Sequence, residues 1–297
     1  WGLKTDPHNQ TAASLEAVRD YHRRLSERRE ELDYEIDGIV IKLDDLALRR
    51  KLSVRAASPR WALAWKFPPR KEVTELVDIV VQVGRTGHLT PVALLAPVDV
   101  GGVTVSRATL HNADEVARKD VRVGDRVRVI RAGDVIPEIE GREKQPGKER
   151  GEPFAMPTEC PACGAEVVRD GAYHLCPAGL ACPAQLVGRI VHYGSRNAMD
   201  IVHLGEKTAR QLVSNGLVWD MADLYDLSVD ELEDLKGFAR KSAQQLHDAI
   251  QGAREVPMDR FVYALGIPHI GRVGARLLCE TVGSMRELRQ PEVAELT

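Results

Sequence analysis

The sequence predicts a multidomain α+β protein, because three patterns follow one another along its 297 residues. Short β-type runs separated by Gly, Pro and Asp fill residues 73–139, four cysteines lie within residues 160–182, and a helical pattern follows Pro183. A chain of this length holds about two ordinary domains or several smaller ones. We therefore expect four regions, at residues 1–69, 70–150, 151–184 and 185–297.

Composition and charge exclude several classes of protein. Hydrophobic residues make up 43% of the chain and charged residues 29%, which excludes general disorder. No run approaches the roughly 20 apolar residues of a membrane helix. Residues 1–6 have the pattern of neither a signal peptide nor a transit peptide, so we expect a cytoplasmic protein with no membrane partner. The 41 basic and 44 acidic residues give a net charge of −3, so any binding to nucleic acid must depend on local placement of charge.

The first region is predicted to contain one helix and two strands. Residues 11–32 have the apolar spacing of a helix, and Thr11 or Ser14 can cap its start. Residues 34–43 are rich in β-branched side chains, and residues 61–67 alternate large and small apolar residues. Both runs are predicted to be strands, and the first is expected to be mostly buried.

Three polar residues in these strands are candidates for chemistry. Lys42 lies in an apolar run, where a lysine is costly unless it meets an anion; the alternative is a strand-end lysine that reaches solvent. Lys66 shares its face with two alanines, which leave room for a flat group or a phosphate. Asp37 would lie on the opposite face from Lys42 unless the chain bends at Gly38. Two lysines facing one pocket would stabilise the charge of a phosphoryl-transfer transition state.

The second region is predicted to be a small β-barrel. Its β-type runs cover residues 76–83, 92–95, 103–108 and 125–130, and about 70 residues of this kind fit an OB-fold. Two segments pair an arginine with glycines, through Arg85 and Arg131. Glycine lets the backbone approach a nucleic-acid phosphate that arginine can bind, although ordinary turns with a surface arginine are the alternative.

The third region is predicted to hold a zinc ion. Its cysteines follow the spacing C-x2-C-x12-C-x5-C, at Cys160, Cys163, Cys176 and Cys182. In a cytosolic chain such spacing indicates zinc rather than disulfides, and four thiolates make a closed structural site. His174 in place of Cys176, or a reduced or redox-active cluster, are the alternatives. The fifth cysteine, Cys279, is expected to be a small buried helix residue.

The fourth region contains a repeat. An apolar residue, a small residue, an alanine and a leucine recur in register from Leu204, Phe238 and Ile270, and residues 294–297 are interpreted as the start of a further unit. Such a period indicates tandem helical hairpins. Helix N-termini after glycine turns can bind phosphate without reading bases. The candidate DNA-binding residues at these turns are Gly205, Lys207, Arg240, Lys241, Gly271 and Arg272.

Taken together, these motifs resemble the bacterial NAD-dependent DNA ligases. Residues 37–42 and 61–67 are similar to the fourth and fifth nucleotidyltransferase motifs, and residues 82–87, 106–112 and 131–137 are similar to the OB domain of that family. The order of the regions is also the same. The resemblance implies the C-terminal part of a nucleotidyltransferase (adenylation) domain, an OB-fold β-barrel, a four-cysteine zinc finger and a helix-hairpin-helix α domain.

The resemblance also implies a reaction. Such ligases seal nicks in duplex DNA: a lysine is adenylylated by NAD, the AMP passes to the 5′-phosphate, and the 3′-hydroxyl displaces it to form a 3′-5′ phosphodiester bond. Lys42 and Lys66 would contact the adenylate phosphate, and Asp37 would organise the nucleotide site with Mg2+. Arg85 and Arg131 would hold the duplex. A monomeric, nucleoid-associated cytoplasmic enzyme of DNA replication and repair, with structural Zn2+, is the expectation.

Some features depart from the family pattern. The chain contains no Lys-x-Asp-Gly tetrapeptide, which carries the nucleophilic lysine, so we expect it not to self-adenylate. We interpret it as a fragment without the nicotinamide-recognition and BRCT domains. His203, Ala239 and His269 stand where glycine is common in the hairpins. Exposed strand edges would make residues 1–69 less stable than the rest, or lead them to associate with a neighbour.

Two other functions fit part of the pattern. A non-catalytic DNA-binding scaffold would use the same zinc module and hairpins, but it leaves the two lysines unexplained. An ATP-dependent ligase or capping enzyme would share the lysine motifs and the barrel. It does not predict four clustered cysteines or the repeat.

Overall fold

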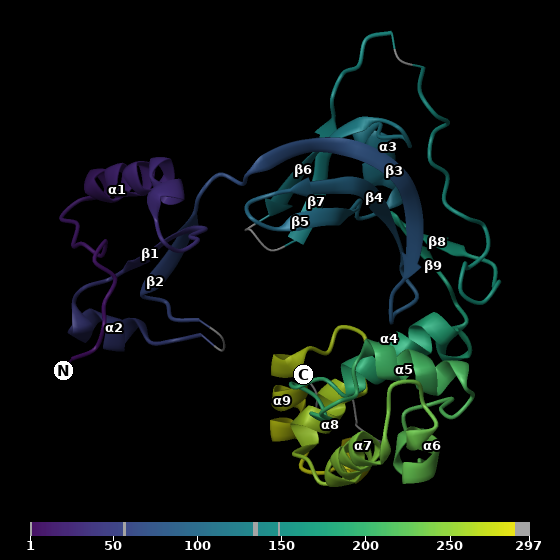
Figure 1. The fold of residues 1–297 in the computed structure, drawn as a ribbon. Helices are drawn as coiled ribbons and strands as arrows, with labels where there is room; N and C mark the ends of the chain where they lie inside the picture. Colours follow the sequence, from purple (N-terminus) through teal and green to yellow (C-terminus); the bar gives the residue numbers. More distant parts are fainter. Residues whose placement is uncertain (1, 56–57, 133–135, 148, 289–297) are drawn as a thin grey trace. The chain divides into compact units, whose positions relative to one another are not determined.

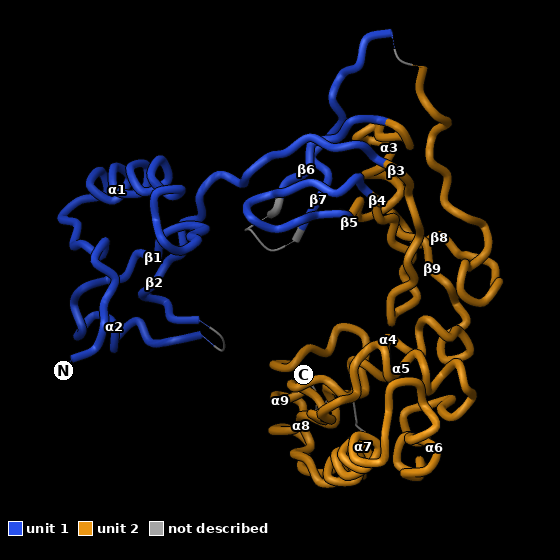
Figure 2. Tube along the Cα trace, viewed as in Figure 1, with its two compact units in different colours: residues 1–76, 95–108, 125–148 blue, residues 77–94, 109–124, 149–297 orange. Residues whose placement is uncertain are grey.

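The computed structural model describes residues 2–55, 58–132, 136–147 and 149–288 (Figure 1). The side chains of 131, 132 and 136 lie outside this description. Contacts divide the chain into two units, coloured in Figure 2: residues 1–76, 95–108 and 125–148 form one, and residues 77–94, 109–124 and 149–297 form the other. Among the described residues, no helix has the length and apolar character needed to cross a membrane.

The first region contains two helices beside a two-stranded sheet (Figure 1). Helix α1 spans Leu15–Glu27, and the Ser14 side chain caps it by accepting the Ala17 N–H at 3.1 Å. The chain then tightens into a 3-10 turn, η1, at Arg29–Glu31, so the predicted helix over 11–32 was too long at both ends. Helix α2 at Leu46–Leu52 was not predicted.

The sheet of this region pairs β1, Gly38–Lys42, with β2, Ala62–Lys66, in antiparallel register. The run predicted over 34–43 is therefore shorter, because residues 34–36 have no partner in this two-stranded sheet. Of the described hydrophobic residues before residue 70, only Ile39 and Phe67 are buried.

The barrel consists of five strands that close in the order β3-β4-β5-β7-β6. These strands are β3 Lys71–Val83, β4 Leu89–Asp99, β5 Thr104–Thr109, β6 Arg126–Ala132 and β7 Ile136–Arg142. Leu76, Val127 and Ile139 are fully buried in its interior. The predicted OB-fold barrel is confirmed, and closure removes free sheet edges.

Two elements of this region were not predicted. Residues 136–142 form the strand β7, although the sequence around them was interpreted only as a glycine turn with an arginine. Helix α3, Ala113–Lys119, follows β5; His111 takes a left-handed conformation with φ 64° and Asn112 caps the helix. This geometry explains the residue pattern over 108–112 as a strand-to-helix turn.

The cysteine module contains the two-stranded sheet β8, Val168–Asp170, with β9, Tyr173–Leu175, followed by the 3-10 turn η2, Gly179–Ala181. Helical structure begins directly after it, at Pro183, where a proline is well suited to the first position of a helix.

Three packed helix pairs form the helical region (Figure 1): α4 with α5, α6 with α7, and α8 with α9. Their bounds are α4 Pro183–Tyr193, α5 Glu206–Ser214, α6 Val229–Glu233, α7 Arg240–Gly252, α8 Met258–Ala264 and α9 Arg272–Thr281, with the 3-10 turn η3 at Asp223–Asp226 and the short α10 at Met285–Leu288. A single cluster of twenty buried residues, including Leu212, Leu246 and Ile250, forms their core. The further unit expected at 294–297 lies outside the described residues.

Candidate functional site

The pairing of β1 with β2 places the two candidate lysines on one face of the sheet. Gly38 lies opposite Lys66, and Lys42 lies opposite Ala62. Residues directly opposite each other in an antiparallel pair share a face, so Lys42 and Lys66 share a face as expected. They stand at opposite ends of the ladder, about 13 Å apart along the strands. One phosphate could therefore meet both ammonium groups only where the two side chains converge.

Asp37 is held at the same end of the sheet as Lys66. The Lys66 ammonium group forms an ion pair with the Asp37 carboxylate, and the Phe67 N–H donates to the Asp37 carbonyl oxygen at 2.8 Å. Gly38 is needed because β2 passes very close: a Cβ at this position would lie 2.4 Å from the Trp65 carbonyl oxygen. The glycine thus allows the two strands to approach closely, which brings the Asp37 carboxylate next to the Lys66 ammonium group.

The expectation that residues 34–43 form a mostly buried strand was wrong, and the strand that pairs with it is also largely exposed. Lys42 and Lys66 are exposed, as is Val40 between them, with 61% of its surface accessible. Helix α1 covers the other face instead: the His22 ring stacks on Trp65 at 4.2 Å between centroids, and its Nε2 lies 3.2 Å from the Lys66 carbonyl oxygen. The alternative that the lysines reach solvent agrees with the structure, and their face is open to a ligand.

The four clustered cysteines come together as the spacing predicts. Cys160, Cys163, Cys176 and Cys182 place their sulfurs within 4.8 Å of one another, and none forms a disulfide. The Cys163–Cys176 and Cys160–Cys182 sulfur distances are 3.5 and 4.0 Å. A tetrahedral zinc ion with Zn–S bonds of about 2.3 Å requires sulfurs about 3.8 Å apart, so the cluster fits this ion.

The surroundings of the sulfurs also fit a metal ion. Burial raises the pKa of the Cys182 and Cys176 thiols, so a cation is needed to hold both as thiolates. Backbone N–H groups point at the sulfurs, among them those of Ala162 and Cys163 toward Cys160. His174 is not a member of the cluster, so the alternative ligand set is not supported by the geometry of the described residues.

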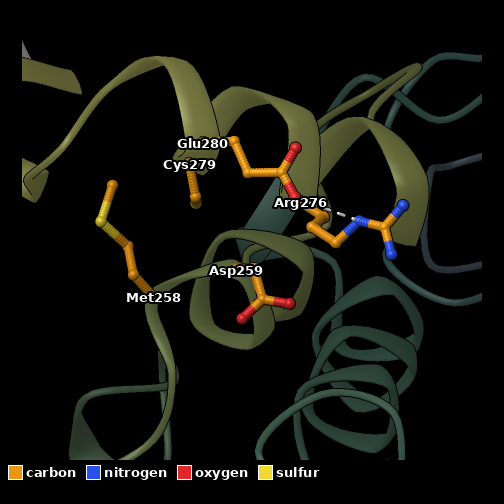
Figure 3. Close-up of a pocket in the computed structure, with 5 residues that line it drawn as sticks. All are labelled: Met258, Asp259, Arg276, Cys279 and Glu280. Carbon is orange, nitrogen blue, oxygen red and sulfur yellow. Dashed lines mark ion pairs between the residues drawn. The ribbon is translucent and has the colours of Figure 1, made fainter.

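Cys279 is not the buried residue that was expected. It is half-buried on α9 and lines a shallow surface pocket together with Met258, Asp259, Arg276 and Glu280 (Figure 3). Burial, and then the charge of Asp259, raise the pKa of its thiol. The Arg276 Nε lies 3.5 Å from a Glu280 carboxylate oxygen in the same helix. None of the predicted site residues is among the described residues that line this pocket.

Arg85 lies in the turn between β3 and β4, where α4 packs against it. A Cβ at Gly188 of α4 would lie 2.8 Å from the Cβ of Arg85, so the helix requires glycine there. The Arg85 guanidinium reaches the loop at Gly266, where an added Cβ would lie 3.1 Å from its Nη1. Arg131 pairs through its backbone with Pro137, and its side chain lies outside the described residues.

The hairpin turns share one backbone geometry despite their different residues. Gly205, Ala239 and Gly271 are the N-caps of α5, α7 and α9. Two positions before each cap the backbone is left-handed: φ is 72° at His203, 89° at Gly237 and 66° at His269. His203 and His269 therefore adopt the left-handed conformation that Gly237 takes in the middle hairpin. Histidine in place of glycine at these two positions leaves the backbone of the turn unchanged.

The charged candidates at these turns differ in their partners. Arg240 forms an ion pair with Asp230 and another with Glu233 at 3.2 Å, and these hydrogen bonds raise its pKa. Arg272 donates to the Asn197 side chain at 3.2 Å. Lys207 and Lys241 are exposed, and no ion pair involves either lysine among the described residues. The two lysines are thus better placed to meet a phosphate than the two arginines.

Family models match the chain in the order of its regions. The NAD-dependent DNA ligase adenylation domain matches residues 1–70, and the NAD-dependent DNA ligase OB-fold domain matches residues 73–150. A SAM-like helix-hairpin-helix tandem matches residues 196–251, and a helix-hairpin-helix motif matches residues 260–297.

Two proteins with similar sequences are both named DNA ligase. A DNA ligase of Alkalilimnicola ehrlichii is 50% identical over 298 residues, which cover 100% of this chain and 44% of that protein. A DNA ligase of Haloarcula marismortui is 49% identical over 288 residues, which cover 97% of this chain and 41% of that protein. The chain belongs to the NAD-dependent DNA ligase family. It spans about two fifths of the length of these curated relatives. The predicted combination of ligase adenylation, OB-fold and helix-hairpin-helix domains with a cysteine cluster that could hold a metal ion is confirmed.

Proposed function

We propose that this chain binds nicked duplex DNA and forms part of the nucleotide site in a ligase that seals nicks with NAD as adenylate donor. Membership of the ligase family and the relatives' shared name support this reaction. The observation that carries it is the register of β1 and β2, which gathers Lys42, Lys66 and Asp37 on one open sheet. A DNA-binding scaffold has no use for that arrangement.

Each of these residues has a proposed task. Lys42 and Lys66 bind the adenylate phosphate and spread the charge that develops during transfer. Asp37 orients Lys66 through their ion pair and can also accept Mg2+, since carboxylates are the usual protein ligands of that ion. Magnesium would add positive charge beside the phosphate.

DNA binding is proposed to be shared among the regions bounded as 1–69, 70–150, 151–184 and 185–297. The zinc module is structural. The residues that we propose to contact DNA are Arg85, Arg131, Gly205, Lys207, Arg240, Lys241, Gly271 and Arg272. Contacts of this kind position the duplex and do not read its sequence. The protein would act as a monomer in the cytoplasm, at the nucleoid, in replication and repair.

The 297 residues alone are proposed not to self-adenylate, because they contain no Lys-x-Asp-Gly tetrapeptide. The last step needs neither that lysine nor NAD. Sealing of a nick that already carries AMP on its 5′-phosphate, in the presence of Mg2+, is therefore the test. We expect Lys42→Ala to slow this sealing by about 100-fold, as the loss of one charge-stabilising group usually does.

Lys51→Ala is the matched control, because Lys51 is an exposed lysine of α2 in the same region. Equal sealing rates in Lys42→Ala and the unchanged chain would refute the role of Lys42. A chain that binds the nick tightly but never seals it would favour the second candidate, a non-catalytic scaffold. One observation favours that candidate: only two hydrophobic residues are buried in the described part of the region that carries the lysines.

A further inference from the structure

One polar side chain next to the cysteine cluster is buried, although the proposed ligase reaction gives it no role. Gln185 lies in the first turn of α4, and only 2% of its surface is accessible. A buried amide is costly unless it is hydrogen-bonded. Its Nε2 donates to the Cys176 carbonyl oxygen at 2.9 Å, which is a bond to the backbone of a metal ligand.

Gln185 also reaches a second ligand. Its backbone N–H, like that of Ala184, donates to the sulfur of Cys182. One residue thus contacts Cys176 through its side chain and Cys182 through its main chain. These two cysteines come from different segments, the end of β9 and the start of α4, so Gln185 fixes their separation.

The same carbonyl group of Cys176 borders the turn between β3 and β4. Gly87 of this turn has φ 86°, and a Cβ there would lie 2.6 Å from the Cys176 carbonyl oxygen and 3.2 Å from the Gln185 Oε1. The Cys176 N–H donates to the Gly87 carbonyl oxygen at 2.9 Å. Cys176 is therefore held between Gly87 and Gln185, and any shift of one must move the others.

The turn in question carries Arg85, which packs on α4 one helical turn beyond Gln185, at Gly188. From these contacts we infer that Gln185 is a positioning residue for the metal centre and couples that centre to the Gly84–His88 turn. In this arrangement the metal fixes Cys176, Cys176 fixes Gly87, and the turn holds Arg85 against α4. Residues that orient metal ligands typically change metal affinity by 10- to 100-fold when they are replaced.

The inference does not depend on nick sealing, so its test uses zinc release from the complete 297-residue chain loaded with Zn2+. A chromogenic chelator in excess reports the release rate. We expect Gln185→Glu, which keeps the size but removes the amide donor, to release zinc about 10- to 100-fold faster than the unchanged chain. Gln245→Glu is the control, because it changes the charge in the same way at a residue that is exposed on α7.

A second variant approaches the same carbonyl from the other side. Gly87→Ala places a methyl group against the Cys176 carbonyl oxygen and should also accelerate zinc release. Gly124→Ala controls for backbone strain, because Gly124 has φ 87°, a Cβ there would meet open space, and it lies outside the cysteine module. Zinc release in Gln185→Glu within twofold of Gln245→Glu would overturn the inference. So would equal release in Gly87→Ala and Gly124→Ala.

A measurement without any substitution covers the case in which the variants do not fold. Removal of zinc from the unchanged chain should raise hydrogen exchange at the amides of Gly84, Gly87 and Cys176, which the turn and its neighbour hold in 2.8–2.9 Å hydrogen bonds. The amides that pair β6 with β7 should keep their protection. Unchanged exchange in the turn after zinc loss would show that the metal centre and the turn are independent.

Discussion

The region before residue 70 and the helical hairpin region use their hydrophobic residues in opposite ways. In the hairpin region, twenty buried residues form one cluster that joins all three helix pairs. In the first region only Ile39 and Phe67 are buried among the described residues, while Leu15, Val40 and Leu63 each expose more than half of their surface. Lys42 and Lys66, which we propose to bind a ligand, therefore lie in the weakly packed region, and the hairpin turns lie in the strongly packed one.

This difference has a physical consequence for the site. Packing fixes a side chain only when its neighbours fill the space around it. The turns before α5 and α7 can present backbone N–H groups in fixed positions, because the buried Leu212 and Leu246 hold the helices behind them. The Lys42 and Lys66 face has no such support within the described residues, so we expect a ligand on it to order the sheet rather than meet a preformed surface.

The largest expected effect is a difference in hydrogen-exchange protection. Amides in α5 and α7 should exchange only through global opening of the hairpin region, whereas the amides that pair β1 with β2 should exchange through local opening. We expect the second group to exchange at least about 100-fold faster at neutral pH in the free protein. Protection of β1 and β2 equal to that of α7 would contradict the comparison.

A pair of truncations gives the next largest effect. Leu246 of α7 is fully buried, so Leu246→Ala should lower the free energy of unfolding of the hairpin region by about 2–5 kcal/mol. Val40→Ala removes a side chain that is 61% exposed and should change stability by no more than about 0.5 kcal/mol. Denaturant unfolding, followed by hydrogen exchange of the amides in each region, measures the change in the free energy of unfolding for both variants. Similar costs for the two variants would mean that β1 is packed in solution.

The sequence predicted a structural feature well when the signal for that feature lies in neighbouring residues. The cysteine spacing and the hairpin repeat are local patterns, and both produced the predicted geometry at Cys160–Cys182 and at the three helix N-caps. Burial of the strand over residues 34–43 was predicted wrongly, because an apolar strand pattern cannot show whether anything covers the strand.

Two further features could not be found by local reasoning. Gln185 stands in an apolar helix pattern, and its partner Cys176 is nine residues away across the metal site. Strand β7 was missed because residues 131–137 were interpreted only as a glycine-containing segment with an arginine, and the pairing of β7 with β6 has no signal in neighbouring residues. The isolated glutamine two residues after Pro183 was the available signal for the first of these.

Two glycine substitutions should act in opposite directions. Gly38→Ala in β1 places a Cβ 2.4 Å from the Trp65 carbonyl oxygen, so we expect it to destabilise the sheet by about 1–3 kcal/mol. Gly252→Ala at the end of α7 meets open space and should stabilise the helix by up to about 1 kcal/mol. Thermal unfolding of each variant gives the sign. A neutral Gly38→Ala would mean that the two strands separate readily.

The smallest expected effect concerns acid. The Tyr34 hydroxyl and the His8 N–H donate to Asp6 and hold its pKa below the ordinary value of 3.8. In the hairpin region the Ser228 N–H and hydroxyl do the same for Glu231, whose ordinary pKa is 4.5. Because both pKa values are lowered on folding, each contact stabilises its region above these ordinary values and is lost as the pH falls below them.

The two regions should nevertheless respond differently to this loss. The buried Leu232 still holds α6 when Glu231 is protonated, so the amide of Leu232, which donates to the Ser228 carbonyl oxygen at 3.2 Å, should stay protected. No buried side chain supports the segment around Asp6 among the described residues, so the His8 amide should lose its protection as the pH falls below about 3.8 and through the lowered pKa of Asp6. Exchange rates corrected for their intrinsic pH dependence measure this, with Asp6→Asn and Glu231→Gln as references that lack each carboxylate. The two carboxylate contacts are otherwise similar, and the buried leucine is what distinguishes them. If the Leu232 amide lost its protection over the same pH range as the His8 amide, packing would not explain the different acid response of the two regions.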